Sequence, residues 1–226
     1  MESTPAPRRP RRSDALSAEV IVQAAIGILD DEGEEALTFR ALATVLATGP
    51  GAIYHRLSNK QEILAAAAAE LVGAAVTWPR STDDSEASIR ALMLYLFDVI
   101  DEHPWIGAQL SREPWQAALL EMFENIGRLL VSLGVPERRQ FVATTSLVNF
   151  VLGVAGQYAA AARLSRDAER SSLLRNVAND LRSEANATSH PFAHRMAGQL
   201  AGHDDREQFA EGVDLLLIGI ISTAGR

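Results

Sequence analysis

The chain contains no cysteine, which excludes disulfide bonds, thiolate metal sites and cysteine nucleophiles. Aromatic residues make up only 6% of its 226 residues, while alanine and leucine are abundant, and this composition favours helix over sheet. No apolar run reaches the length of a membrane span, and the N-terminus lacks the apolar segment of a signal peptide. We therefore expect a cytoplasmic protein with no membrane partner.

Cations are scarce and unevenly placed in the sequence. The formal net charge is −8, yet residues 1–13 carry four arginines against one glutamate, a local charge of +3 that leaves −11 for the rest. Because three prolines interrupt this segment and it has no apolar pattern, we predict a disordered basic arm over 1–16. A basic tip on an acidic body is typical of a protein that touches DNA with one end. The arm itself has two interpretations, minor-groove contact or a solvated tail.

Apolar residues recur at helical spacing from Ser17 onward, and no segment alternates as a strand does. The pattern predicts a first helix over 17–32, a second capped by Thr38, a short third opened by Pro50 and a fourth capped by Ser58 or Asn59. Further helices are predicted at about 84–102, 104–111, 114–133, 137–163, 167–187 and 205–224. The expected fold is all-α, with a helix-turn-helix domain over 17–62 and a ligand-binding and dimerisation bundle over 63–226.

The third helix has the properties of a DNA-recognition helix. Such a helix is short, shows its N-terminal face to the major groove and is locked by its other face onto the two helices before it. Gly51 and Ala52 are small enough for close approach to base pairs, while Ile53 and Leu57 supply the lock. The polar side chains beside them, Tyr54 above all, then point away from the lock toward phosphates or base edges.

Two runs here, Thr38-Phe39-Arg40-Ala41-Leu42-Ala43 and the segment Gly-Ala-Ile-Tyr-His-Arg-Leu-Ser-Asn-Lys-Gln-Glu-Ile-Leu over 51–64, together resemble the signature of the TetR family of bacterial transcriptional regulators. The resemblance covers roughly residues 17–70. It implies an all-helical homodimer whose N-terminal domain binds DNA and whose larger helical domain binds an effector. It also implies that Thr38, Tyr54 and Lys60, the only lysine in the chain, contact phosphate. The full set predicted to bind DNA is Thr38, Arg40, Thr48, Pro50, Gly51, Tyr54, His55 and Lys60.

The turn before the third helix departs from the family pattern at three positions. Ala47 replaces the family's turn glycine, so a left-handed conformation there is either strained or reshaped. Thr48 stands where the family has valine. Gly49 replaces the usual serine cap and gives up a side-chain hydrogen bond to the third helix.

The C-terminal region is expected to enclose a cavity lined by apolar and aromatic groups with a few polar ones. The candidate lining residues are Tyr95, Trp105, Trp115, Met122, Phe123, Asn149, Phe150 and Gln157. Asn149 stands within an apolar run, where a buried amide needs a partner, either a ligand, nearby backbone or a second subunit. The expected two-fold interface combines the small residues Gly153, Gly156 and 159–162 with Val213, Leu216, Leu217 and Ile220.

Two other function classes compete with a regulator. His190 and His194 lie one helical turn apart upstream of His203, a spacing that can chelate metal in an enzyme, but the same region fits a polar loop around Pro191. A dimeric scaffold that has lost DNA binding is supported only by the unusual turn. The sequence shows no recognisable arrangement of nucleophile, base and orienting group that would indicate an enzyme. We therefore predict a non-enzymatic repressor without cofactor or metal, released from a palindromic operator by a small-molecule effector.

Overall fold

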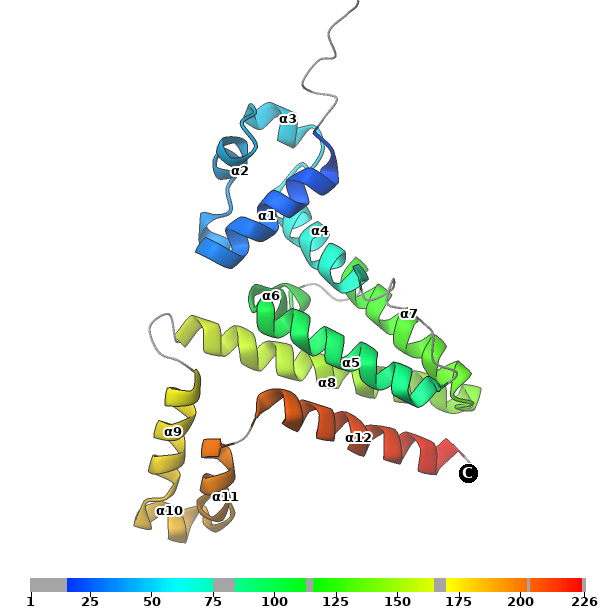
Figure 1. The fold of residues 1–226 in the computed structure, drawn as a ribbon, viewed down its shortest axis with the longest axis vertical. Helices are drawn as coiled ribbons and strands as arrows, with labels where there is room; N and C mark the ends of the chain where they lie inside the picture. The colour runs from blue at the N-terminus through cyan, green and yellow to red at the C-terminus, as the bar shows by residue number, and fades with distance from the viewer. Residues whose placement is uncertain (1–15, 75–83, 113–115, 165–169, 203, 225–226) are drawn as a thin grey trace, which may run out of the picture. The chain divides into compact units, whose positions relative to one another are not determined.

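A computed structural model describes residues 16–74, 84–112, 116–164, 170–202 and 204–224, and every regular element in these ranges is helical (Figure 1). The all-α prediction is confirmed. The chain divides into two compact units, Met1–Glu70 and Leu71–Arg226. The boundary expected between residues 62 and 63 stays a prediction, and both positions lie within one continuous helix, α4 (Lys60–Gly73).

The first unit is built from α1 (Ala18–Glu32), a 3₁₀ turn η2 (Glu34–Ala36), α2 (Phe39–Val45), α3 (Pro50–Tyr54) and the start of α4. Ser17 caps α1 by accepting a hydrogen bond from the Val20 N–H at 3.4 Å. Each helix turns an apolar face inward because its apolar residues recur every three or four positions. The buried side chains at the centre include Ile21, Leu29, Leu42, Ile53 and Ile63.

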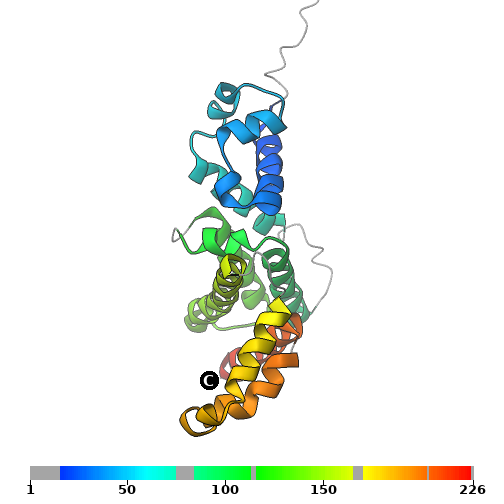
Figure 2. The same ribbon diagram turned by 90° about the vertical axis from the view of Figure 1, so that its left-hand side faces the viewer.

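The second unit contains the remaining helices. They are α5 (Ser85–Glu102), α6 (Trp105–Leu110), α7 (Ala117–Ser132), α8 (Glu137–Leu164), α9 (Arg170–Leu181), α10 (Glu184–Ser189), α11 (Pro191–Gly202) and α12 (Asp205–Ala224). The long α8 packs against α6 and α7, and α12 lies along α5. Helices α9 and α11 run side by side as a separate pair that joins α8 to α12 (Figure 2).

The region between α8 and α12 differs from the sequence prediction. The single helix expected over 167–187 ends at Leu181, and a new short helix follows. The Asn186 amide donates to the Asp180 carbonyl at 2.8 Å and contacts Ser183 Oγ at 3.2 Å, and such local bonds compete with continuation of a helix. The region around Pro191 is the first turn of α11 rather than a loop, because a proline at that position loses no helical hydrogen bond.

The stretch Glu137–Tyr158 of α8 is long and apolar enough to cross a membrane, by length and composition only. Its contacts give a different explanation for this composition. Leu147, Val151 and Ala155 are fully buried inside the unit, against α6 and α7. We conclude that α8 is the central helix of a bundle, for which high hydropathy is expected.

Ion pairs connect α12 to α5 along their polar sides. The Arg206 guanidinium donates two hydrogen bonds to the Asp98 carboxylate, at 2.7 and 3.0 Å, and these bonds raise the pKa of Arg206. Arg90 bridges Glu86 on its own helix and Asp214 on α12. All are at least one-third exposed, so each contributes at most about 1 kcal/mol, and they fix which face of α12 meets α5 more than they stabilise the fold.

Candidate nucleic-acid interface and effector cavity

The turn between α2 and α3 keeps the geometry of a glycine-containing turn although it contains alanine. Thr38 caps α2 by accepting from the Ala41 N–H at 3.1 Å. At the other end Ala47 has φ +48°, its N–H donates to the Thr44 carbonyl at 3.2 Å, and the Thr48 N–H donates to the Ala43 carbonyl at 3.0 Å. These are the two bonds of a Schellman helix end, so the left-handed conformation is adopted rather than avoided.

Helix α3 is held by its apolar side and shows its polar side to solvent. Gly49 caps it without a side-chain hydrogen bond, and Pro50 occupies the first turn, as expected. Ile53 is fully buried and Leu57 is 6% exposed, so both lock the helix in place. Tyr54 is 52% exposed, and the small Gly51 beside it is exposed as well.

Tyr54 is held by a partner that the sequence did not reveal. Its ring stacks on Phe39 of α2, with ring centroids 3.7 Å apart and planes 6° from parallel. Phe39 belongs to the run over 38–43, and its pairing with Tyr54 was not predicted. The stack restricts the tyrosine to one orientation while its ring remains half exposed, so the hydroxyl has a defined position for contact with a phosphate.

Most of the other residues predicted to bind DNA are also accessible. Arg40, Pro50 and His55 are exposed, Thr38 is exposed at its cap position, and Thr48 is half-buried. Arg40, Thr48 and Pro50 also share one shallow surface hollow, formed where α2, the turn and α3 meet. The structure therefore brings Arg40, Thr48 and Pro50 together on the surface beside the turn that precedes the recognition helix.

Lys60 starts α4 and has a contact that the sequence did not predict. Its Nζ donates to the backbone carbonyl of Glu34 in η2 at 2.6 Å, and the side chain is half-buried. This bond ties the start of α4 to η2. Since an ammonium carries three hydrogens, the contact leaves hydrogens that can be donated to a phosphate.

Ser58 and Asn59 both take part in capping α4. Asn59 Oδ1 accepts from the Glu62 N–H at 2.8 Å, which makes Asn59 the cap residue. In return, Glu62 accepts from the Ser58 N–H at 2.8 Å and from the Ser58 hydroxyl at 2.6 Å. These hydrogen bonds hold the pKa of the Glu62 carboxyl below its ordinary value and fix the position from which Lys60 projects.

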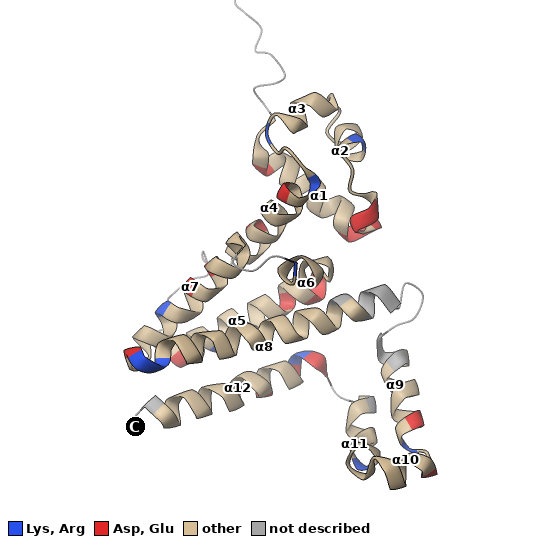
Figure 3. Cartoon of the chain, turned by 180° about the vertical axis from the view of Figure 1, so that it is seen from behind, with Lys and Arg blue, Asp and Glu red and all other residues tan. Residues whose placement is uncertain are grey.

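Charge is distributed unequally over the first unit. Among its described residues the cations are Arg40, Arg56 and Lys60, and acidic residues outnumber them. Figure 3 shows acidic residues gathered at the end of α1 and in η2, and Glu19 and Glu62 lie in the first turns of α1 and α4. A polyanion such as DNA is therefore favoured on the side that carries α2 and α3. The predicted arginine arm lies outside the described residues.

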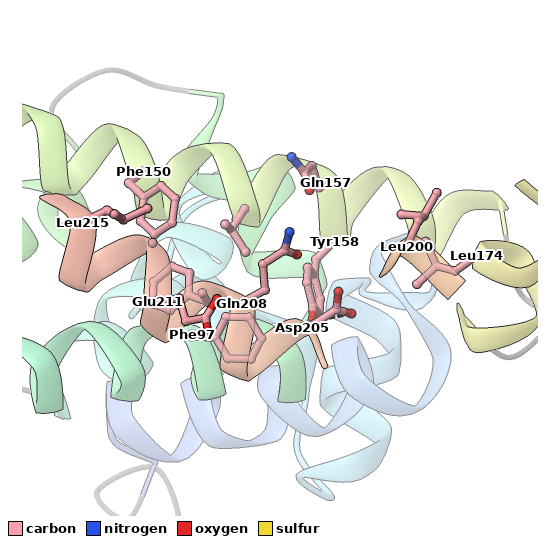
Figure 4. Close-up of a pocket in the computed structure, with 13 residues that line it drawn as sticks. Phe97, Phe150, Gln157, Tyr158, Leu174, Leu200, Asp205, Gln208, Glu211 and Leu215 are labelled. Carbon is pink, nitrogen blue, oxygen red and sulfur yellow. Dashed lines mark hydrogen bonds between the residues drawn. The ribbon is translucent and has the colours of Figure 1, made fainter. Parts of the chain in front are cut away.

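The second unit contains a cavity of about 610 Å³ between α5, α8, α9, α11 and α12 (Figure 4). It is lined by Phe97, Phe150, Val154, Gln157, Tyr158, Leu174, Leu200, Asp205, Gln208, Phe209, Glu211, Gly212 and Leu215. Four rings form a connected cluster along it. Phe97 meets Tyr158 edge-on at 5.6 Å and Phe209 at 5.0 Å, and Phe209 stacks on Phe150 at 4.9 Å.

Polar groups lie around this ring cluster. The Tyr158 hydroxyl donates to the Asp205 carboxylate at 3.2 Å, and Figure 4 shows the two side chains together. Gln157 on α8 and Gln208 and Glu211 on α12 complete the polar lining and are exposed. The arrangement of a few polar groups around apolar and aromatic walls is typical of a small-molecule site.

The eight residues predicted to bind the ligand are not all brought together. Phe150 and Gln157 line the cavity. Met122 is core, 1% exposed, and Phe123 packs against Phe141 with ring centroids 6.2 Å apart, so neither lines it. Trp105 is half-buried elsewhere, and Trp115 lies outside the described residues.

Tyr95 also lies away from the cavity. Its hydroxyl donates to the Leu71 carbonyl at 2.9 Å, and burial raises the pKa of the phenol above its ordinary value. Sequence reasoning missed the aromatic residues of the cluster other than Phe150. Phe97, Tyr158 and Phe209 stand on three different helices, so no local spacing connects them.

Asn149, expected within an apolar run as a buried amide, is not buried within a single chain. The side chain is exposed. The apolar run around it covers every side of the helix, so it does not show which side is buried. Leu147 and Val151 face the core, and Asn149, two positions from each, faces the opposite way.

The predicted interface on α12 is also incorrect in part. Val213 and Leu217 are 1% and 0% exposed and pack inside their own chain. Leu215, Ile218 and Ile221 are the exposed apolar residues of α12.

His190 and His194 each have a hydrogen-bond partner within the chain. His190 Nδ1 lies 2.8 Å from Ser189 Oγ, and His194 Nδ1 lies 3.0 Å from the Leu181 carbonyl. No group of three potential ligands occurs in the part of the chain that the structure describes, which leaves out His203. His194 therefore connects α11 to the end of α9, while the contact of His190 stays within the end of α10.

The arrangement in the first unit defines a helix-turn-helix DNA-binding protein, and comparison with known proteins specifies its kind. Residues 21–67 match the model of bacterial regulatory proteins of the tetR family, and residues 77–223 match that of the tetracyclin repressor-like C-terminal domain. The chain belongs to the TetR family. It is a DNA-binding transcriptional regulator with a ligand-binding C-terminal domain, and not an enzyme, as predicted.

Individual relatives agree with this assignment. An HTH-type transcriptional regulator of Saccharopolyspora erythraea is 27% identical over 221 residues, which cover 96% of this chain and 90% of that protein. The structure of SCO7222, a TetR from Streptomyces coelicolor, is 43% identical, with a TM-score of 0.79 over 92% of this chain and 98% of that one. The Streptomyces coelicolor protein ActR, solved in complex with actinorhodin, has the same fold at 23% identity, with a TM-score of 0.75 over 93% and 98% of the two chains.

Proposed function

We propose that this protein is a repressor that binds a palindromic operator as a homodimer and is released when a small molecule occupies the C-terminal unit. The observation that carries the proposal is the exposed face of α3, where a ring-stacked tyrosine stands beside Gly51 on a helix locked by Ile53. The ligand acts by preferring the conformation in which the two recognition helices no longer match the operator half-sites. ActR, a relative in fold, was solved with a small molecule bound, which supports a ligand-controlled mechanism.

The DNA contacts divide into two kinds in this proposal. Thr38, Tyr54 and Lys60 bind phosphates and set the register of α3 on the duplex. Arg40, Thr48, Pro50 and His55 lie nearer the base edges, with Gly51 allowing close approach. An arginine, a histidine and a threonine supply hydrogen bonds, and proline and glycine supply only apolar contact, so readout rests on few side chains.

The homodimer is supported by unpaired apolar faces on the C-terminal helices. On α12, Leu215 and Ile218 are 73% and 62% exposed. On α8, Phe141 and Val142 are 64% and 57% exposed, and Gly153 further along the helix is exposed too. An isologous pairing of α8 and α12 with their copies buries these faces in a four-helix arrangement, and such closed two-fold assembly is the commonest one.

The proposal is tested by titrating the purified protein against the DNA upstream of its own gene at several salt concentrations. We expect binding to weaken steeply with salt, because neutralised phosphates release counterions. Lys60→Ala is expected to lower the slope of log affinity against log salt by about 0.9. Tyr54→Ala is expected to weaken binding about tenfold.

Tyr54→Phe is the matched variant, because it keeps the stack on Phe39 and removes only the hydroxyl. It separates phosphate bonding from packing of the recognition helix. Salt-insensitive binding, or affinity that neither Tyr54→Ala nor Lys60→Ala changes, contradicts the proposal. A regulator of this kind works where the chromosome is, so we place it in the cytoplasm.

A further inference from the structure

We infer that the cavity of the second unit takes a flat aromatic ligand that carries a positive charge. The inference rests on the proposed function in treating this cavity as the effector site. Three observations support it: the ring cluster, the sign of the charges around it, and the space created by a single glycine.

The ring cluster favours a flat aromatic molecule. Phe150 and Phe209 are nearly parallel, with planes 16° apart, and Phe97 continues the cluster at 37° to Phe209. Figure 4 shows Phe97 and Phe150 among the side chains that line the cavity. Aromatic partners stack on or edge against such rings, and the negative face of each ring also attracts a cation. The volume of about 610 Å³ lies within the range of sites for drug-sized molecules.

The charged groups around the cavity select against anions. Of the thirteen described lining residues, Asp205 and Glu211 are acidic and none is basic. The neighbouring cation on α12, Arg206, is not among the lining residues and donates to Asp98 on α5. An anionic ligand therefore meets two carboxylates without a lining cation, whereas an ammonium or iminium group is attracted by both.

Gly212 on α12 allows the ring of Phe150 to lie directly against the helix backbone. A Cβ atom at this position would lie 2.5 Å from Phe150 Cζ and within 3.3 Å of two other ring atoms. The ring therefore lies end-on against the backbone of α12 at a distance that only glycine permits. Any larger residue displaces Phe150, and with it the ring that stacks on Phe209.

The test measures direct binding in the absence of DNA. Fluorescence anisotropy of rhodamine 6G, a cationic xanthene dye, is compared with that of fluorescein, an anionic dye with the same ring system. We expect rhodamine 6G to bind more tightly. The double variant Asp205→Asn, Glu211→Gln is expected to weaken rhodamine 6G binding about tenfold and to leave or improve fluorescein binding, since it removes both carboxylates that attract a cation.

Two further variants make the result specific to this site. Glu207→Gln removes an exposed carboxylate of α12 that does not line the cavity, and it is expected to bind both dyes as the parent protein does. Gly212→Ala is expected to weaken rhodamine 6G binding through displacement of Phe150. Circular dichroism checks that this variant is folded, and the Asp205 and Glu211 variant tests the proposal independently of it.

The outcomes that overturn the inference differ from those that overturn the repressor proposal. Equal affinity for the two dyes, or rhodamine 6G binding that the double variant does not change, overturns it. Leu215 both lines the cavity and belongs to the exposed face of α12, so the cavity lies beside the proposed dimer interface. A double variant that alters dimerisation but not dye binding therefore also overturns the inference, because the two carboxylates then act on the interface and not on the ligand. Specific rhodamine 6G binding without operator binding leaves the inference standing and contradicts the repressor.

Discussion

Ala47 holds a left-handed backbone conformation at the end of α2, with φ +48°. An L-residue with a Cβ pays roughly 1–2 kcal/mol for this conformation, whereas glycine adopts it freely. The two hydrogen bonds of the helix end hold the residue there. The turn that orients α3 is therefore less stable with alanine at position 47 than it would be with glycine.

Ala47→Gly is expected to stabilise the protein by about 1 kcal/mol, because it removes this strain without changing the hydrogen bonds. Urea denaturation measures the change in the free energy of unfolding. The matched control is Ala41→Gly inside α2, which has ordinary helical geometry and is expected to destabilise by roughly 0.5–1 kcal/mol. If both substitutions destabilise equally, the left-handed turn is not a source of strain.

Glu62 gives the first unit a pH dependence through the start of α4. Its pKa in the folded state is lowered, first by the hydrogen bond from the Ser58 hydroxyl and then by that from the Ser58 N–H. A carboxyl with a lowered folded pKa stabilises the fold above its ordinary pKa and loses this contribution as pH falls through the folded value. The cap is therefore stronger at neutral pH than in acid.

Glu62→Gln is expected to lower the melting temperature at neutral pH and to approach the parent protein as the pH falls through the lowered pKa of the Glu62 carboxyl, where the parent becomes protonated. Thermal melts across this range supply the measurement. Glu70→Gln, at an exposed position of the same helix, is the control. A deficit for the Glu62 variant that is independent of pH argues against this origin.

At the scale of elements, α8 and α12 each show the apolar side that a single chain leaves uncovered. The exposed residues Leu215 and Ile218 lie three positions apart on α12, so they form one stripe. The opposite, buried side of the same helix carries Val213 and Leu217. The helix is apolar on two sides, which agrees with one side packed on α5 and the other on a second copy.

Ile218→Asp combined with Leu215→Asp is expected to convert the protein to monomers by placing four charges in the two-fold interface. Analytical ultracentrifugation measures the change. Leu120→Asp on α7 is the matched control, because Leu120 is 55% exposed and lies outside the proposed interface. Dimers that survive the double substitution place the interface elsewhere.

At the scale of the whole molecule, DNA and ligand binding are properties of different units. Thermodynamic linkage requires that a ligand which weakens DNA binding by a given factor is itself bound more weakly, by the same factor, when operator is present. The unit boundary at residues 70 and 71 lies within α4, so this helix belongs to both units. It provides a continuous covalent connection between them.

We expect rhodamine 6G to weaken operator binding, and saturating operator to weaken rhodamine 6G binding by an equal factor of roughly 5 to 150. Gel-shift titrations with dye and anisotropy titrations with operator measure the two factors. The double variant Asp205→Asn, Glu211→Gln is the control and is expected to reduce both factors together. A factor that keeps growing with ligand concentration, instead of levelling off, indicates that dye and operator compete for one site instead of acting through two.

The sequence by itself determined the features that depend on neighbours along the chain. Helical periodicity predicted the all-α fold, capping residues predicted the starts of α2 and α4, and Pro50 predicted that of α3. The in-register run over 51–64 predicted the recognition helix and its family. The strain at Ala47 was also one of the two outcomes expected from the sequence, because alanine stands there in place of the family's turn glycine.

Only the tertiary structure decided what depends on residues distant in sequence. Phe39 and Tyr54 stack because two helices cross, and the ring cluster unites Phe97, Phe150 and Phe209 from three helices. Periodicity identifies that a helix has an apolar side, but not which side the rest of the chain covers. For that reason Asn149 proved to be exposed and the free face of α12 fell on Leu215 and Ile218.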